Sequence, residues 1–413
     1  MTKRIPVTAA AVLLCVAPLA PAVAQDGDQK VGARFEVRLE DLPKLGATPS
    51  SVNPPEKVKR GPDDGLRVPE GFQASIFAQG LDHPRWMGLA PNGDVFLAQP
   101  EAGEVTLLRD ADGDGKAEMK TTFAKGFKRP HGIAFVEGAV LIADIEGIWS
   151  LDYEPGDTRA EKRRRLTKRN AFGGAPGNHW TRNIAVAPDN SALYVAIGSM
   201  TNISEEPEPH ATVQRFDMDG GNQTTFTAGL RNPVGIAFYP GTNHLYVVVN
   251  ERDGYGDGMV PDYFTRIEEG EFFGWPYAWL GPNPDPKMKG KHPDLVKKTQ
   301  VPDLLFEAHS APIGLVFYDR DQFPKDYRGD AFVALRGSWN SGEPTGYKVV
   351  RVKFKDGEPT GWYENFAAGF WTAGEDKARV WGRPAGLLVA ADGSLLIADD
   401  TGGTVWRVSW TGE

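Results

Sequence analysis

This 413-residue sequence contains a repeated motif, called here the repeated phrase, and arginine and histidine residues recur near the start of its copies. Each copy has a Pro or a substitute, one variable residue, a Gly or Asn, an apolar run, a tight turn and a second apolar run. Guanidinium groups bind carboxylate or phosphate in a bidentate manner. The repetition therefore predicts a site for a small polyanion. Alignment of the copies gives three columns just ahead of the Gly or Asn: Arg85, Arg129, Asn232 and Arg383; His131 and Arg182; His179 and Arg231.

Each of these side chains has a simpler alternative role, which is to cap a strand and pair with a nearby acid. Strand capping explains any single member of the columns. Recurrence in several copies is harder to explain in that way, so the pattern favours a functional site on one face.

A second group of residues has the composition of a cation site. Asp110, Asp112 and Asp114 follow the Asp-x-Asp-x-Asp-Gly start of a calcium loop, but its twelfth position is Thr121 instead of a bidentate Glu. The sequence leaves two possibilities open, a structural calcium site and a polar hairpin. Either one lies away from the arginine and histidine columns.

The repeated phrase also predicts the elements that position these residues. Six copies carry anchor residues separated by 44, 51, 52, 79 and 72 residues, and the two long spacings indicate insertions after the fourth and fifth copies. Repeats of this size with short β-branched and aromatic runs are typical of propeller blades. We therefore expect an all-β, six-bladed β-propeller. The anchors are Gly88, Gly132, Asn183, Gly235, Gly314 and Gly386.

The two ends of the repeat region are expected to meet. An open propeller would expose an edge strand. The early run 72–77 can complete the last blade beside the run 404–410. Sustained helical periodicity is absent from the sequence, which argues against a helical repeat.

The N-terminal residues divide into two parts. A basic start, an apolar run and Ala22-Val23-Ala24 predict a secretory signal over 1–24, and the only cysteine, Cys15, lies within it. Residues 25–66 are rich in Pro, Lys and Asp and are expected to form an extended leader. The propeller is then expected over 67–413, in a periplasmic or secreted protein without a membrane span in its mature chain.

The overall charge limits the class of partner. The chain carries 46 Lys and Arg against 55 Asp and Glu, which gives a net charge of −9. The basic residues are spread along the chain apart from the run 162–165. This balance argues against a nucleic-acid partner.

Three phrases carry a resemblance to a known family. Asn178-His179, the run Gly229-Leu-Arg-Asn-Pro that continues to Phe238, and the run 273–276 (Phe-Gly-Trp-Pro) resemble the soluble glucose and sorbosone dehydrogenase superfamily. The segments 179–183, 249–253 and 337–340 resemble the sorbosone branch in particular. The resemblance implies a six-bladed propeller that binds pyrroloquinoline quinone (PQQ) and calcium and oxidises a sugar or aldehyde.

The resemblance also implies roles for individual residues. His179 would be the general base, with Arg231 and Asn232 beside the reacting carbonyl and substrate oxygens, and Arg383 would bind a PQQ carboxylate. Backbone carbonyls of Asp253 and Gly254 would hold the cofactor calcium. The basic columns at the same mouth add further candidate cofactor-binding residues: Arg129, His131, Arg182 and Arg336.

The sequence departs from the family pattern at several positions. Ser199 replaces an aspartate that supports the histidine in the glucose enzymes, and Ala385 replaces the second of their paired arginines. The cofactor-binding lysine has no clear counterpart, Arg336 being only nearby. These departures bear on cofactor geometry and on substrate.

Two other classes of function remain open from the sequence. Metal-dependent sugar lactonases also use six-bladed propellers, but their ion requires converging acidic and Asn side chains. A non-catalytic binding propeller would use the same ring as a recognition surface.

The sequence has no C-x-x-C-H haem motif, so a dehydrogenase of this kind would need an external electron acceptor such as a cytochrome or a quinone.

Overall fold

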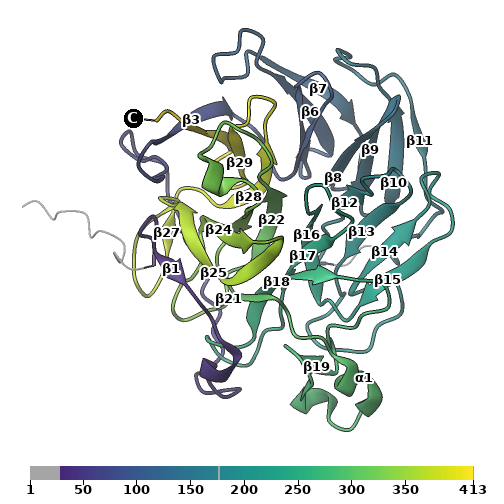
Figure 1. The fold of residues 1–413 in the computed structure, drawn as a ribbon, viewed down its shortest axis with the longest axis vertical. Helices are drawn as coiled ribbons and strands as arrows, with labels where there is room; N and C mark the ends of the chain where they lie inside the picture. The colour runs from purple at the N-terminus through teal and green to yellow at the C-terminus, as the bar shows by residue number, and fades with distance from the viewer. Residues whose placement is uncertain (1–27, 175–176, 413) are drawn as a thin grey trace, which may run out of the picture.

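The computed structural model describes residues 28–174 and 177–412, and Figure 1 shows them as a ring of small sheets. The predicted secretory signal over 1–24, with Cys15, lies outside the described residues. Helix is limited to α1 (Pro293–Lys298) and the 3-10 turns η1 (Leu39–Asp41), η2 (Pro286–Met288) and η3 (Lys325–Tyr327) in the described part of the chain. The expected all-β class is confirmed. None of the helices within those ranges is long and apolar enough to cross a membrane.

The strands form antiparallel sheets that follow one another along the chain. The first sheet contains β4 (Met87–Leu89), β5 (Val95–Gln99), β6 (Glu104–Arg109) and β7 (Met119–Lys125). The second contains β8 (Gly132–Val136), β9 (Ala139–Asp144), β10 (Gly147–Asp152) and β11 (Arg163–Arg165). The third contains β12 (Ile184–Val186), β13 (Leu193–Ile197), β14 (Thr212–Phe216) and β15 (Thr224–Ala228).

Three more sheets complete the series. The fourth contains β16 (Asn232–Phe238), β17 (Leu245–Asn250), β18 (Pro261–Ile267) and β21 (Leu304–Ala308). The fifth contains β22 (Pro312–Phe317), β23 (Ala331–Leu335), β24 (Lys348–Lys355), β25 (Glu358–Ala367) and β1 (Arg34–Phe35). The sixth contains β28 (Pro384–Val389), β29 (Leu395–Asp399), β30 (Thr404–Trp410) and β3 (Phe72–Gln79).

The sixth sheet joins the two ends of the repeat region, as expected from the sequence. β3 pairs antiparallel with β30, with Phe72 opposite Trp410 and Gln79 opposite Thr404. Hydrogen bonds therefore fix an N-terminal strand to the last strand of the chain.

The remaining short strands belong to the insertions and the leader. β19 (Ala278–Trp279) pairs with β20 (Asn283–Pro284) in the insertion after the fourth phrase. The leader contributes β1 to the fifth sheet and β2 (Glu56–Lys57) to a small sheet with β26 (Trp371–Ala373) and β27 (Arg379–Val380). The segment expected to be extended is thus anchored to the repeat region by strand pairing.

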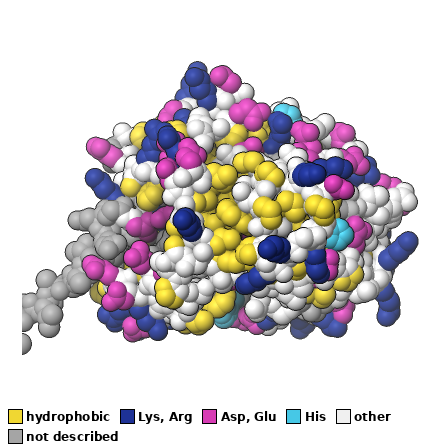
Figure 2. Space-filling view, turned by 90° about the horizontal axis from the view of Figure 1, so that it is seen from below, with side chains coloured by type: hydrophobic (Ala, Val, Ile, Leu, Met, Phe, Trp, Pro, Cys, Tyr) yellow, Lys and Arg dark blue, Asp and Glu magenta, His cyan; other side chains and the backbone are white. Residues whose placement is uncertain are grey.

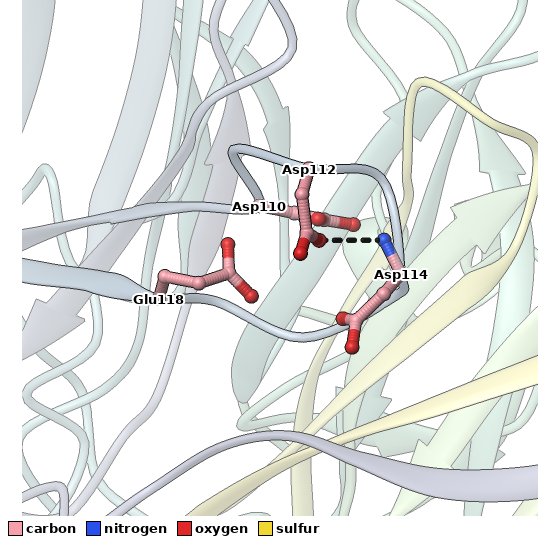
Figure 3. Close-up of side chains that lie close together, drawn as sticks. All are labelled: Asp110, Asp112, Asp114 and Glu118. Carbon is pink, nitrogen blue, oxygen red and sulfur yellow. Dashed lines mark hydrogen bonds between the residues drawn. The ribbon is translucent and has the colours of Figure 1, made fainter.

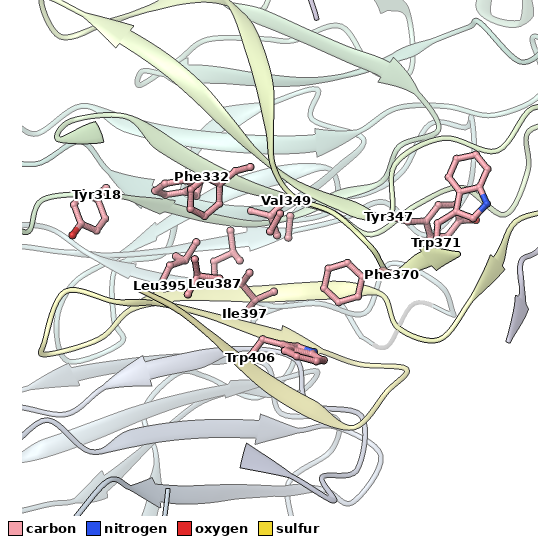
Figure 4. Close-up of a cluster of buried hydrophobic side chains, with 14 of the residues drawn as sticks. Tyr318, Phe332, Tyr347, Val349, Phe370, Trp371, Leu387, Leu395, Ile397 and Trp406 are labelled. Carbon is pink, nitrogen blue, oxygen red and sulfur yellow. The ribbon is translucent and has the colours of Figure 1, made fainter. Parts of the chain in front are cut away.

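Alternation along each strand supplies two cores. Successive strand residues point to opposite faces of the sheet. Leu245, Val247 and Val249 of β17 pack with the third sheet, whereas Tyr246 and Val248 pack with the fifth. Both faces are buried, so the strand is apolar throughout. Figure 4 shows such a core between the fifth and sixth sheets, with Phe332 and Val349 facing Leu387 and Ile397.

The repeated Gly lies where neighbouring sheets approach most closely. A Cβ on Gly314 of β22 would lie 2.2 Å from the Ala385 carbonyl oxygen on β28. A Cβ on Gly386 of β28 would lie 2.0 Å from the Arg85 carbonyl oxygen, ahead of β4. At the third anchor, Asn183 instead donates its Nδ2 to the Val234 carbonyl at 2.6 Å. The repeat is thus a packing requirement of the inner strands.

One face of the molecule combines charges of both signs with a hydrophobic area. In the face shown in Figure 2, Lys and Arg side chains alternate with Asp and Glu around a central group of hydrophobic side chains. This mixture agrees with the small net charge of the chain relative to its length.

Candidate active site

A cavity of about 850 Å³ is lined by residues near the starts of first strands and the ends of second strands of five of the six larger sheets, the second sheet contributing none. In an antiparallel hairpin these two points lie at the same edge. Residues ahead of or at the start of first strands that line the cavity include Arg85, His179, Arg231, Asn232, His309 and Arg383. Residues at or beyond the ends of second strands are Glu101, Asn250, Glu251, Arg336 and Asp400.

Three arginines gather near one carboxylate in this cavity, and two of them bind it. Asp400 accepts from Arg85 Nη1 at 2.5 Å and from Arg336 Nε at 2.7 Å. Arg383 donates only to the carbonyls of Arg336, at 3.0 Å, and Gly337, at 2.5 Å. Burial, the nearby Arg336 charge and Arg85 lower the pKa of Arg383 to about 9, although Asp400 opposes this shift. At neutral pH the group therefore carries an excess of positive charge.

Asp400 is the ionised member of this group. Burial by itself raises the pKa of Asp400, but Arg336 and Arg85 outweigh that effect and hold the pKa well below the usual range of a carboxyl group. The carboxylate thus stays charged and offsets part of the arginine charge. The remaining excess suits a ligand with more than one carboxylate.

His179 is held with one ring nitrogen bound and the other unengaged by protein groups of the described chain. Its Nδ1 lies 2.9 Å from the Ser199 carbonyl and 3.0 Å from Ser199 Oγ. A carbonyl can only accept, so Nδ1 carries the proton and Nε2 presents its lone pair. Burial, followed by the Arg231 charge, lowers the pKa of His179 to about 3. The ring is therefore neutral at ordinary pH.

This geometry shows how His179 is oriented without the aspartate of the family pattern. The sequence has Ser199 at the position of that aspartate. The backbone carbonyl of Ser199 supplies an acceptor that any residue at this position would have, while Ser199 Oγ donates to the Thr201 carbonyl at 2.7 Å.

Arg231 is fully engaged by protein acceptors. Its Nη1 donates to the carbonyls of Glu251, at 2.6 Å, and Asn250, at 3.3 Å. Its Nη2 donates to Asn202 Oδ1 at 2.9 Å and to Asp253 Oδ2 at 2.8 Å. Its Nε donates to the Asn202 carbonyl at 3.3 Å. The hydrogen bonds of Arg231 hold the segment 250–253, and its positive charge remains buried beside the cavity.

Three residues of the predicted columns lie outside the lining of this cavity. His131 is buried between Trp86 and Trp180 and bonds Asn183 Oδ1 through Nδ1 at 2.7 Å. Arg182 is fully buried and donates to the carbonyls of His179 and Thr181. Arg129 is partly exposed and lies over the ring of Trp180. These contacts with protein groups give the three side chains packing roles, and none of them lines the cavity.

Oxygen atoms gather at the opposite side of the cavity from the arginine group. Glu251, Asp253 and Asp262 line it, and burial raises the pKa of Asp262 to about 7. Within the described residues, Glu251 Oε1 is buried without a hydrogen-bond partner. The Asp253 carbonyl, one of the two predicted calcium ligands, accepts from Asn202 Nδ2 at 2.8 Å. Gly254 adopts a positive φ of 94° beside it.

A family model described as TrAA12-like matches residues 66–260 and 284–411. These two stretches are most of the chain. The chain belongs to the TrAA12-like family.

Individual relatives of this TrAA12-like protein include sugar dehydrogenases. A PQQ-dependent pyranose dehydrogenase of Coprinopsis cinerea is 27% identical over 417 residues, with 83% of this chain and 54% of that protein covered. The chain thus spans about half the length of that relative. An uncharacterized protein of Borreliella burgdorferi is 30% identical over 355 residues, with 83% of this chain and 90% of that protein covered.

Solved structures share the fold. The holo PQQ domain of the Coprinopsis cinerea pyranose dehydrogenase has a TM-score of 0.71 at 22% identity, with 87% of this chain and 100% of that domain covered. The PQQ-bound aldose sugar dehydrogenase of Streptomyces coelicolor has a TM-score of 0.58 at 18% identity, with 83% of this chain and 99% of that chain covered. The resemblance to the soluble PQQ-dependent sugar dehydrogenase superfamily is confirmed.

The predicted calcium loop of this TrAA12-like protein brings four carboxylates together. Asp110, Asp112, Asp114 and Glu118 place ligand atoms within 4.8 Å of one another, and Figure 3 shows them around one turn. Backbone amides already occupy part of the group, because Asp110 accepts from Gly113 at 2.7 Å and from Gly115 at 2.9 Å. Glu118, at the ninth position of the loop, supplies the fourth carboxylate, whereas the twelfth position is Thr121. The structural calcium site at Asp110, Asp112 and Asp114 stays a prediction.

Several cavity residues escaped the sequence comparison. Asp400, Asn202, Trp339 and Asn340 line the cavity, but none lies in the three aligned columns. The columns covered only the starts of the first strands. A second alignment on the ends of the second strands would have found Asn250, Arg336 and Asp400 together, because strand starts and strand ends of a hairpin lie at the same sheet edge.

Proposed function

We propose that this protein is a PQQ-dependent dehydrogenase that oxidises the C1 hydroxyl or aldehyde of a sugar and passes the electrons to an external acceptor. The observation that carries the proposal is one cavity that holds an excess-positive arginine group and a neutral histidine with an available Nε2. The family membership and the named sugar dehydrogenases among its relatives support the same function.

We further propose that the six sheets with four or more strands are the blades of one closed propeller over 67–413. Their inner strands contact one another in chain order, and β28 of the last sheet contacts β4 of the first. The close approach of Gly386 to Arg85 supports the same closure. The leader 25–66 would fasten the ring from outside.

The arginine group fits the PQQ carboxylates. Asp400 pairs with Arg85 and Arg336, whereas Arg383 donates only to backbone carbonyls. Arg85 Nε is buried without a partner in the described chain. Guanidinium groups in such a setting bind carboxylates strongly. These three residues would hold the cofactor. When bound, PQQ supplies a quinone that accepts a hydride.

The protein's own contribution to the reaction would be proton removal and orientation. His179 Nε2 would accept the proton of the sugar hydroxyl or hydrate, because Ser199 fixes the ring with Nδ1 protonated. Arg231 would favour developing negative charge through its buried positive charge. Asn232 would orient substrate oxygens beside it.

Calcium would lie among hard oxygen donors on the other side of the cavity. The carbonyls of Asp253 and Gly254 and the unpaired carboxylate oxygen of Glu251 are ligands of the type that calcium prefers. With the signal predicted over 1–24, the natural setting for such an enzyme would be the periplasm or the exterior of the cell.

Titration of purified apoprotein tests the proposal. We expect PQQ to bind in the micromolar range or tighter with calcium present, and the loaded protein to reduce an artificial electron acceptor when an aldose is added. Chelation should remove this activity and calcium should restore it. A pH-stat assay with sugar lactones runs in parallel. Acid release from a lactone without PQQ binding would contradict the dehydrogenase and indicate a lactonase. Absence of both PQQ-dependent oxidation and acid release would indicate a non-catalytic binding propeller.

A further inference from the structure

Two exposed apolar side chains line the otherwise polar cavity. Trp339 is 46% exposed and Met200 is 45% exposed, and both belong to its lining. Large hydrophobic side chains with this much exposure are few in the described chain, the others being Leu39, Val52 and Val301. An aromatic ring left open at a cavity edge indicates a binding surface.

The segment that carries Trp339 is fixed by residues of the leader. Asn53 donates its backbone N–H to the Trp339 carbonyl at 2.7 Å. Its side-chain Nδ2 donates to the carbonyls of Ser341, at 3.0 Å, and Asp376, at 2.7 Å. The leader thus determines where the backbone of Trp339 lies. The family model begins only at residue 66, so Asn53 lies outside the part of the chain that the family shares.

The same segment is tied to the proposed reaction centre. Asn340, the next residue, donates Nδ2 to Asp253 Oδ1 at 2.6 Å, and Asp253 also binds Arg231. The Gly342 N–H donates to Asp257 Oδ1 at 2.8 Å, and Thr48 of the leader accepts from the Asp257 N–H at 2.8 Å. Trp339 therefore lies in a segment at the cavity edge that hydrogen bonds hold on both sides, and it is not an isolated surface residue.

We propose that Trp339 is the platform on which the pyranose ring of the substrate stacks, and that Asn53 of the leader is the residue that positions it. A pyranose presents a face of C–H groups, which packs on an aromatic ring, while its hydroxyls need polar partners such as those across this cavity. The inference rests on the proposed sugar dehydrogenase function and adds the residue that recognises the sugar ring.

Steady-state kinetics with the PQQ- and calcium-loaded enzyme tests the platform. Among D-glucose, D-galactose and D-mannose, the sugar that is oxidised fastest serves as substrate. Trp339→Ala should raise KM about tenfold or more and change kcat by less than about threefold, since each tenfold corresponds to about 1.4 kcal/mol of binding. Trp339→Phe should retain most of the affinity. PQQ affinity should be unchanged in both variants. Val52→Ala is the control, because Val52 is a neighbour of Asn53 and is 80% exposed.

Asn53→Ala should also raise KM, but by less than Trp339→Ala does. The double variant should have the same KM as Trp339→Ala alone. Such non-additivity is expected when one residue acts through the other, whereas a general structural role would add. Additive effects, or an effect on kcat alone, would overturn the assignment of Asn53.

Saturation-transfer NMR gives a readout that does not depend on turnover. Irradiation of aromatic protons of the apoprotein should transfer magnetisation to the C–H protons of the three sugars, and Trp339→Ala should abolish most of this transfer. Unchanged transfer and unchanged KM would overturn the platform while leaving the dehydrogenase function intact. Failure of PQQ binding in the wild type, with transfer still dependent on Trp339, would instead overturn the proposed function.

Discussion

At the scale of single residues, chemistry depends on which atoms remain available after the protein has satisfied its own hydrogen bonds. Arg231 and His179 stand in the same aligned column, but their atoms are used differently. Arg231 donates hydrogen bonds to residues of the segment 250–253, whereas His179 forms hydrogen bonds to the described chain only through Nδ1. Proton transfer therefore falls to the histidine.

His179→Ala should lower kcat by about a hundredfold to ten-thousandfold, which is the usual contribution of general-base catalysis. PQQ affinity should stay nearly unchanged, because the arginine group lies apart from the histidine. Stopped-flow turnover and a separate PQQ titration measure the two quantities.

Ser199→Ala is the matched control for His179→Ala. It keeps the backbone carbonyl that orients the ring, so kcat should stay within about threefold of wild type if that carbonyl suffices. A His179→Ala variant with more than about a third of wild-type turnover would place the base elsewhere.

Arg383→Ala should show the opposite pattern, with weaker PQQ binding and partial activity at saturating cofactor. Loss of one charged hydrogen-bonding group costs about 1.5–3 kcal/mol, or roughly ten- to a hundredfold in Kd. Arg129→Ala is the control, because Arg129 stood in the same sequence column but lies outside the cavity lining. Equal losses in Kd for the two variants would contradict this division of the column.

At the scale of strands, the sixth sheet holds the ends of the repeat region together. Phe72 at the start of β3 packs edge-on against Trp410 of β30 and also contacts Phe366 of β25 in the fifth sheet. It further contacts Phe323 and Tyr327 in the connection between β22 and β23. One aromatic ring thus joins the N-terminal strand to two sheets.

Phe72→Ala should lower the free energy of unfolding by about 2 kcal/mol, below the 3–5 kcal/mol of a fully buried Phe because Phe72 is half-buried. Guanidinium unfolding followed by circular dichroism measures the change. Val52→Ala, on the exposed leader, should stay within about 0.5 kcal/mol. A Phe72→Ala variant as stable as wild type would show that closure does not depend on this contact.

At the scale of the whole molecule, two buried neutral histidines link stability to pH. Burial lowers the pKa of His131 to about 3, with the Arg85 charge as a second cause, and burial and Arg231 do the same for His179. In the unfolded chain these rings take up protons below about pH 6.5. Protons therefore favour the unfolded chain between about pH 6.5 and 3, and this contribution to stability is lost as pH falls.

His131→Gln should reduce the loss of unfolding free energy between pH 7 and pH 5 by as much as about 1.4 kcal/mol per pH unit. Burial raises the pKa of Asp262 and of Asp399 to about 7, so these carboxyls act in the opposite direction, and the comparison between variant and wild type separates the histidine contribution. Denaturant titrations at several pH values measure it. Exposed His244→Gln is the control and should leave the slope unchanged. An identical slope in His131→Gln would mean that His131 titrates normally.

The sequence alone determined the strands, their order and the face that carries the arginines. Alternating apolar residues specify strands buried on both faces, and the repeated Gly specifies where inner strands meet, because no Cβ fits between them. The Arg and His columns followed from the same repeat. Family motifs then indicated the class of cofactor.

Only the tertiary structure decided which members of those columns reach the cavity. His131 and Arg182 share an alignment position, and both side chains form hydrogen bonds with neighbouring protein groups instead of lining the cavity. Asp400, Asn53 and the Ser199 carbonyl act on residues far away in sequence, and a backbone carbonyl has no side-chain signature at all. The alternation of residues along a strand predicts which face of the sheet each side chain occupies. Contacts between sheets decide which charges are paired and which polar atoms remain free to bind a ligand.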